Sequence, residues 1–190
     1  MDKKIFLAMS LPHELKGYVD GKDTISGQNI YILLSCHYKT TTVEVVSTVV
    51  GESDFFTDKS KFKPILHHLS DLTKPIEHKG KKFVPIVELA KMCYNNTFNI
   101  YPEIKTFEAL NSNNEESFGF IGYTEDERFS LTFDNTFNNQ SFEFWIDGSE
   151  HYIKQFDLFL RLIEWHFDIA GLIEKGEAID INTLPENPYE

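Results

Sequence analysis

Residues 117–146, SFGFIGYTEDERFSLTFDNTFNNQSFEFWI, decide the fold of this chain. Three segments in this stretch, SFGFIGY, RFSLTF and SFEFWI, place a large apolar residue at nearly every second position. That alternation is typical of strands with one buried face and one wet face. TEDE, residues 124–127, fits a hairpin loop between the first two segments. The stretch therefore predicts an antiparallel meander with a buried aromatic face and a polar, acidic outer face.

The aromatic residues of this stretch allow two interpretations. Exposed aromatic side chains on a sheet stack nucleic-acid bases or sugars. Aromatic side chains that alternate on a meander beneath an apolar helix are core residues, and we favour this interpretation. It applies to Phe118, Phe120, Phe129 and Phe133.

Two helices are expected beside the strands. The first covers residues 85–94, because Pro85 suits a first helical turn and the Asn95-Asn96 pair suits a helix end. The second is a long C-terminal helix over about 150–170, with Asp147 and Glu150 as its capping pair and Gly171 as its stop. Its apolar surface is wider than a surface helix needs, which predicts burial between layers or contact with a partner.

The first half of the chain predicts further strands. IYILLSCHY (30–38) and TTVEVVSTVV (41–50) are expected to pair as antiparallel strands joined at Lys39-Thr40. Another strand is expected at 63–69, and a hairpin follows with its turn at Lys79-Gly80. Residues 10–29 suggest loops with one short strand, and the tail from 176 predicts a short strand at 178–181 and then a frayed end.

The length and the order of these elements predict one α+β domain over residues 1–190. Its expected architecture is an antiparallel sheet, made of N-terminal strands and the Phe-rich meander, with the C-terminal helix packed on it. Runs of strands followed by one long helix favour this class over alternating β-α-β units.

Charge is distributed unevenly along the chain, which has a formal net charge of −12. Residues 1–95 carry 13 Lys and Arg against 11 Asp and Glu, whereas residues 96–190 carry 5 against 19. An acidic face can imitate nucleic-acid phosphates and occupy a basic groove of a partner, although an ordinary soluble surface has the same composition. The candidate partner-binding residues are Glu125, Asp126, Glu127, Glu143, Asp157 and Glu164.

A basic island, residues 59–82, interrupts the near-neutral first half. It is a candidate site for an anionic partner such as nucleic acid or a nucleotide, and a solvated hairpin explains the same pattern. The island contains no arginine, the residue that contacts phosphates and bases through two parallel hydrogen bonds. The candidate anion-binding residues are Lys59, Lys61, Lys63, Lys79, Lys81 and Lys82.

No catalytic or cofactor motif is found in the sequence. It has no glycine-rich phosphate loop and no nucleophile elbow, and its acidic pairs lie in expected loops. Cys36 and Cys93 are expected to be reduced, small buried hydrophobes. His67, His68 and His78 could belong to an unrecognised hydrolase site, but their spacing is not that of metal ligands. We therefore expect no metal and no cofactor, and we favour a non-enzymatic protein over an enzyme.

The N-terminal apolar run, residues 5–9, is shorter than the roughly 7–15 residues of a secretory signal. No window approaches the roughly 18 apolar residues of a membrane span. The sequence therefore predicts a cytoplasmic protein that does not contact membranes.

Two stretches carry a resemblance to a known group of proteins. FKPILHHLSDLTKPIEHKGKKFVPIVELAK (62–91) and FLRLIEWHFDIAGLIEKGEAIDINTL (159–184) resemble segments of short, uncharacterised proteins encoded in phages and prophages of Bacteroidetes-type bacteria. The resemblance implies a mobile-element origin and action in the cytosol of an infected or lysogenic cell. It implies no activity and no catalytic residues.

Three functions follow as hypotheses. The first is a non-enzymatic accessory protein that binds a host or phage protein through its acidic face and inhibits a host defence or nucleic-acid-processing factor. The second is a nucleic-acid or nucleotide binder that uses Lys59–Lys82. The third is a small hydrolase around His67, His68 and His78. A homo-oligomer formed through the C-terminal helix is also expected to be feasible.

Overall fold

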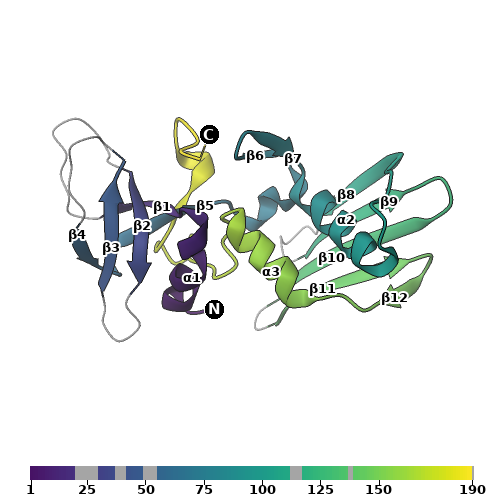
Figure 1. Ribbon diagram of the computed structural model, residues 1–190, viewed down its shortest axis with the longest axis horizontal. Helices are drawn as coiled ribbons and strands as arrows, with labels where there is room; N and C mark the ends of the chain where they lie inside the picture. Colours follow the sequence, from purple (N-terminus) through teal and green to yellow (C-terminus); the bar gives the residue numbers. More distant parts are fainter. Residues whose placement is uncertain (20–29, 37–41, 49–54, 112–116, 137–138, 190) are drawn as a thin grey trace. The chain divides into compact units, whose positions relative to one another are not determined.

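The structure, a computed structural model, describes residues 1–19, 30–36, 42–48, 55–111, 117–136 and 139–189 (Figure 1). Its chain forms two compact units, where the sequence predicts one domain. Unit 1 comprises Met1–His68 and Leu160–Glu190, and unit 2 comprises Leu69–Phe159. Helices and mainly antiparallel sheets make up both units, so the predicted α+β class is confirmed.

Unit 1 is built on a six-stranded sheet in the order β13-β5-β1-β2-β3-β4. Its neighbours are antiparallel except β13 and β5, which are parallel. The pairing of the two predicted N-terminal strands is confirmed, and the predicted joint at Lys39-Thr40 lies outside the described residues. The strands are β1 (Lys16–Val19), β2 (Tyr31–Cys36), β3 (Thr42–Ser47), β4 (Phe55–Asp58), β5 (Phe62–Leu66) and β13 (Ile179–Asp180).

A helix that the sequence does not predict, α1 (Lys3–Ser10), precedes this sheet. Its apolar side buries Phe6 and Leu7 completely, and the hydroxyl of Ser10 donates to the carbonyl of Phe6 at 2.8 Å. The apolar run that is too short for a signal peptide therefore lies within a helix that buries Phe6 and Leu7, whereas Ile5 is 52% exposed. Two short 3-10 turns, η1 (Leu11–His13) and η3 (Ile181–Thr183), complete the unit.

Unit 2 contains the predicted meander as a five-stranded antiparallel sheet in the order β12-β11-β10-β9-β8. Strands β9 (Ser117–Tyr123), β10 (Arg128–Thr136) and β11 (Asn139–Ile146) match the three alternating segments. Strands β8 (Thr106–Asn111) and β12 (Ser149–His151) are additions at its two edges. The aromatic face is buried as predicted, with Phe118, Phe120, Phe129, Phe133, Phe142 and Phe144 each at most 2% exposed.

Helix α2 (Pro85–Phe98) covers this aromatic face (Figure 1). It begins at the predicted proline, but it continues four residues beyond the expected end. The chain leaves the helix only at Asn99, whose left-handed conformation (φ 58°) lets its amide donate to the carbonyl of Asn95 at 2.7 Å. Before α2 come the turn η2 (Leu69–Thr73) and the predicted hairpin of β6 (Ile76–His78) and β7 (Lys81–Phe83).

The predicted long C-terminal helix is wrong, because α3 spans only Gln155–Glu164. The predicted capping pair, Asp147 and Glu150, does not cap it. Asp147 and Gly148, with φ angles of 46° and 81°, form the two-residue turn between β11 and β12, and Glu150 lies in β12. At the other end, His166 adopts φ 60° and turns the chain out of the helix five residues before Gly171. The apolar residues that follow, Ile169, Ala170 and Leu172, are buried in an irregular segment of unit 1.

Candidate functional site

The outer face of the unit 2 sheet is the main candidate surface. Residues directly opposite each other in an antiparallel pair lie on the same face, so the strand register defines this surface. We call it the open face. Its members are Thr106, Glu108 and Leu110 of β8; Ser117, Gly119, Ile121 and Tyr123 of β9; Arg128, Ser130, Thr132, Asp134 and Thr136 of β10; Ser141, Glu143 and Trp145 of β11; and Glu150 of β12.

Helices α2 and α3 contact this sheet on its opposite side. Tyr94 of α2 meets the ring of Phe129 at 5.1 Å between centroids, and Phe159 of α3 meets Phe142 at 5.3 Å. Both partners are inward-facing aromatics. Among the described elements, none is seen to pack on the open face, and Glu108, Leu110, Glu143 and Trp145 are exposed there.

Trp145 lies in a row of residues that crosses the open face from one edge to the other. It pairs with Ser130 on one side and with Glu150 on the other, and Glu108 and Ile121 continue the row. The indole is 36% exposed. Its Nε1 lies 3.4 Å from a carboxylate oxygen of Glu143, at the long limit of a hydrogen bond.

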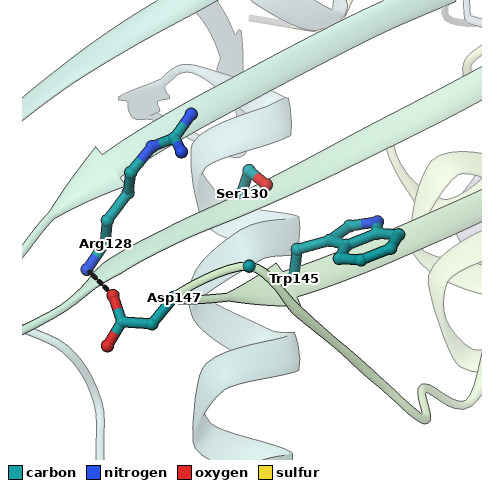
Figure 2. A pocket seen from close by; sticks show the side chains of 5 residues that line it. Arg128, Ser130, Trp145 and Asp147 are labelled. Atoms are coloured by element: carbon teal, nitrogen blue, oxygen red, sulfur yellow. Dashed lines mark hydrogen bonds between the residues drawn. The ribbon is translucent and has the colours of Figure 1, made fainter.

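An open hollow of about 190 Å³ lies beside this indole, lined by Arg128, Ser130, Trp145, Asp147 and Gly148 (Figure 2). The Asp147 carboxylate accepts the backbone amide of Arg128 at 3.0 Å and so holds the end of the hairpin. In Figure 2 the Arg128 guanidinium extends away from that carboxylate. Within the described part of the chain it forms no ion pair, so it is available to a partner.

The open face is acidic, as the sequence predicts. Four carboxylates, Glu108, Asp134, Glu143 and Glu150, share it with a single cation, Arg128. Sequence patterning identified the wet face and Glu143 but missed that Trp145 and Arg128 line one hollow on it. The available signal was the position of Trp145 between Phe144 and Ile146. Because Phe142, Phe144 and Ile146 alternate on the buried face, Trp145 points outward.

The other predicted acidic residues do not share this face. Glu125, Asp126 and Glu127 lie in the β9–β10 hairpin loop, where the hydroxyl of Tyr94 donates to Glu127 at 2.6 Å. Burial, together with this hydrogen bond, raises the pKa of Tyr94 to about 12. Asp157 is exposed in the first turn of α3, and Glu164 pairs with Arg161 at the end of that helix.

The basic island is divided between the two units. Lys59, Lys61 and Lys63 belong to unit 1, in the β4–β5 turn and in β5. Lys79, Lys81 and Lys82 belong to unit 2 and are all exposed on the β6–β7 hairpin, whose turn at Lys79-Gly80 is confirmed by φ angles of 52° and 71°. The second group therefore forms a compact basic tip by itself.

The histidines and cysteines are also divided. His67 and His68 lie in unit 1 and His78 in unit 2. The described residues contain no group of three or more His, Cys, Asp or Glu side chains that could hold a metal ion. Cys93 is 1% exposed on α2, and burial raises the pKa of its thiol to about 12, which confirms it as a buried hydrophobe. Cys36 is half-buried.

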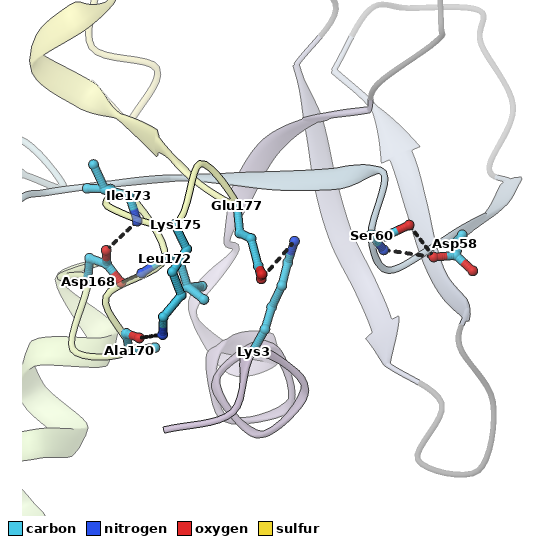
Figure 3. Close-up of polar contacts among 9 residues, drawn as sticks. All are labelled: Lys3, Asp58, Ser60, Asp168, Ala170, Leu172, Ile173, Lys175 and Glu177. Atoms are coloured by element: carbon cyan, nitrogen blue, oxygen red, sulfur yellow. Dashed lines mark hydrogen bonds and ion pairs between the residues drawn. The ribbon is translucent and has the colours of Figure 1, made fainter. Parts of the chain in front are cut away.

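The C-terminal stretch that carries the phage-like resemblance forms a turn that stabilises unit 1 (Figure 3). The buried carboxylate of Asp168 accepts the amides of Leu172 at 2.9 Å and Ile173 at 2.7 Å. Lys175 donates to the carbonyl of Ala170 at 2.7 Å. The backbones of His67 and Phe167 bridge in parallel, which ties this turn to the end of β5. These contacts give the stretch a structural role.

Comparison of the chain with protein-family models, with curated proteins and with solved structures gives no match. Within the ranges that the structure describes, none of the helices combines the length and the apolar character that crossing a membrane requires.

Proposed function

We propose that the chain is a non-enzymatic accessory protein of a phage or mobile element that binds a host protein in the cytoplasm. The binding surface is the open face, and the partner presents a basic surface with an apolar centre, such as the nucleic-acid-contacting face of a defence or nucleic-acid-processing factor. The observation that carries the proposal is the exposed indole of Trp145 set among carboxylates on a sheet face to which no described helix is assigned.

The composition of the open face supports a protein partner. Trp145 on β11 and Ile121, Tyr123 and Leu110 on β9 and β8 provide apolar area on this face, with β10 between the two groups. Trp and Arg are the residue types that most often dominate binding energy. The carboxylates surround this apolar centre. Such an arrangement favours a cationic partner, speeds its encounter and disfavours polyanions such as free nucleic acid.

The test is capture of partners from host lysate with a charge-reversed control. The immobilised chain is compared with Glu108→Lys/Glu143→Lys, which reverses the open face, and with Glu174→Lys/Glu186→Lys, which makes the same change in net charge on exposed residues of unit 1. Circular dichroism melts verify that all three fold. We expect a protein that the wild type and the unit 1 variant retain, that the open-face variant loses, and that heparin displaces.

Heparin competition identifies the chemistry of the captured protein, because a polyanion competes only for a basic surface. Equal capture by the open-face variant, or capture that heparin does not affect, would contradict the proposal. Recovery of no protein at low ionic strength would contradict it as well.

A second candidate function rests on the basic tip of the β6–β7 hairpin. Lys79, Lys81 and Lys82 are exposed within four residues of one another, and only Lys82 lies opposite a carboxylate, that of Glu77. This tip would bind nucleic acid weakly, with an affinity that falls steeply as salt rises. A mobility-shift titration of labelled DNA and RNA tests this second function. The absence of any shift at low ionic strength would contradict it.

A further inference from the structure

Strand β8 is the one long strand at a sheet edge in the described part of the chain. It has six residues, whereas the other edge strands have four (β4), three (β6, β7 and β12) and two (β13). Among the strands that the structure describes, it pairs only with β9, and none of them pairs with its outer row of backbone amide and carbonyl groups. Short strands protect sheet edges from pairing with other chains, and β8 lacks this protection.

Among the side chains of β8, Glu108 is the one charged residue that could oppose edge pairing. The described side chains of the strand, residues 106–110, are all exposed and include no lysine and no proline. Phe107 is 49% exposed and Leu110 is 46% exposed. Exposed apolar side chains on a free edge favour the addition of another strand.

We infer that β8 pairs with β8 of a second copy of this chain and forms a dimer with a continuous ten-stranded sheet. β8 of a second copy has the properties that such an added strand needs, since it is six residues long and exposes Phe107 and Leu110. In an antiparallel pair of strands related by a two-fold axis, opposite residues lie on the same face of the sheet. Because side chains alternate between the faces along a strand, a residue can lie opposite only those residues of the other copy whose numbers differ from its own by an even number. Two alignments then use nearly the full length of β8, one centred on Glu108 and one centred on Ala109.

Charge decides between these two alignments. Centring on Glu108 places the two Glu108 carboxylates directly opposite each other, which is unfavourable. Centring on Ala109 places Ala109 opposite its own copy and Glu108 opposite Leu110, and Phe107 pairs with residue 111. This alignment opposes no like charges. We therefore expect the two copies of β8 to pair with Ala109 at the centre.

The dimer would join two open faces into one surface. Leu110 and Glu108 of both copies lie on that face and would meet at its centre. The inference does not depend on the proposed function, because it rests on the edge of the sheet and not on what the face binds.

Cysteine cross-linking and molecular mass test the inference together. Opposite Cα atoms in such a pair are about 4.5–5.5 Å apart, within the range that a disulfide can bridge. We expect Ala109→Cys to form a disulfide dimer under mild oxidation. Thr106→Cys, exposed on the same strand, should not, because its copies would lie about 20 Å apart. The unmodified chain controls for Cys36 and Cys93, and peptide mapping identifies the linked cysteines.

Light scattering after gel filtration supplies the second measurement, from low micromolar to several hundred micromolar chain. We expect the wild type to approach twice its 22.1 kDa as concentration rises, and Ala109→Lys to remain monomeric because two lysines would meet at the centre. Monomeric wild type throughout this range would overturn the inference. Dimerisation that survives Ala109→Lys, or equal cross-linking of both cysteine variants, would also overturn it. Capture of a host protein by a monomeric wild type would leave the proposed function standing.

Discussion

The ring of Tyr189, the last described residue, stacks on the imidazole of His166 with 4.0 Å between centroids and 19° between planes. The backbone amide of Lys16 donates to the Tyr189 hydroxyl at 3.0 Å, and that hydroxyl donates to the carbonyl of Ile65 at 2.8 Å. Burial raises the pKa of this hydroxyl, so it stays protonated as a donor. The tail therefore docks on β1 and β5 of unit 1, where the sequence predicts a frayed end.

Removing the Tyr189 hydroxyl should destabilise unit 1. Tyr189→Phe keeps the ring on His166 but leaves the Lys16 amide and the Ile65 carbonyl without that partner, which costs about 1–3 kcal/mol. Tyr189→Ala should cost more because the stacked ring is lost as well. Urea unfolding followed by Trp165 fluorescence in a Trp145→Phe background measures unit 1, since each unit contains one tryptophan.

Tyr152→Phe is the matched control for this prediction, because Tyr152 is 91% exposed. It should change the free energy of unfolding by less than about 0.5 kcal/mol. Equal effects of Tyr189→Phe and Tyr152→Phe would show that the docked tail contributes nothing to stability.

Two glycines of β9 should respond differently to alanine because they lie on opposite faces of the sheet. A Cβ on Gly122 would come within 2.5 Å of the Phe120 ring and 3.0 Å of the Phe129 ring, both in the core. On Gly119, which faces outward, it would come no closer than 3.3 Å to Leu110. We expect Gly122→Ala to destabilise unit 2 by about 1–3 kcal/mol and Gly119→Ala by much less.

The same unfolding experiment with Trp145 as reporter, in a Trp165→Phe background, measures this difference. If Gly119→Ala proved as damaging as Gly122→Ala, the assignment of the two faces would be wrong.

Tyr94 should make stability depend on pH at the alkaline end. Burial and the hydrogen bond to Glu127 raise its pKa from 10.0 to about 12. The folded state therefore retains this proton after the unfolded state has lost it. The resulting stabilisation is complete below about pH 10 and is lost as pH rises through about 12. In a titration of tyrosinate absorbance, subtracting the Tyr94→Phe curve from that of the wild type should isolate a transition near 12.

Glu127→Gln serves as the control for Tyr94. This substitution removes the carboxylate, while the Tyr94 hydroxyl stays buried. The pKa of Tyr94 should therefore move towards 10 without reaching it. If the difference between the wild-type and Tyr94→Phe titrations were centred at the ordinary tyrosine pKa of 10.0, the contact between Tyr94 and Glu127 would be contradicted.

Alternating segments were the most predictable part of the fold. Period-2 patterning located β9, β10 and β11 and their buried faces, because a half-buried antiparallel strand leaves that pattern in its residues. The C-terminal helix was overpredicted because buried irregular backbone leaves the same apolar spacing as a helix. The Asp147-Gly148 pair is a strong signal for a two-residue hairpin turn, and interpreting Asp147 and Glu150 as a helix-capping pair concealed β12.

Edge strands and long-range contacts could not be predicted in this way. All the described side chains of β8 are exposed, so it has no buried face and no period-2 signal. The basic island is continuous in sequence, yet the boundary between the units falls between His68 and Leu69 and divides its lysines. The sequence predicted a wet acidic face, but its central residue, Trp145, emerged only from the register that sets it opposite Ser130.

The affinity of the captured basic partner for Trp145→Ala tests the central claim most directly. Phe156→Ala is the matched control, because Phe156 is 62% exposed and lies on α3, away from the open face. If the open face binds the partner, Trp145→Ala should weaken binding by about thirtyfold or more, as for a residue at the centre of an interface. Phe156→Ala should bind within about twofold of the wild type. Unchanged affinity of a folded Trp145→Ala variant would contradict the assignment of the open face as the binding surface.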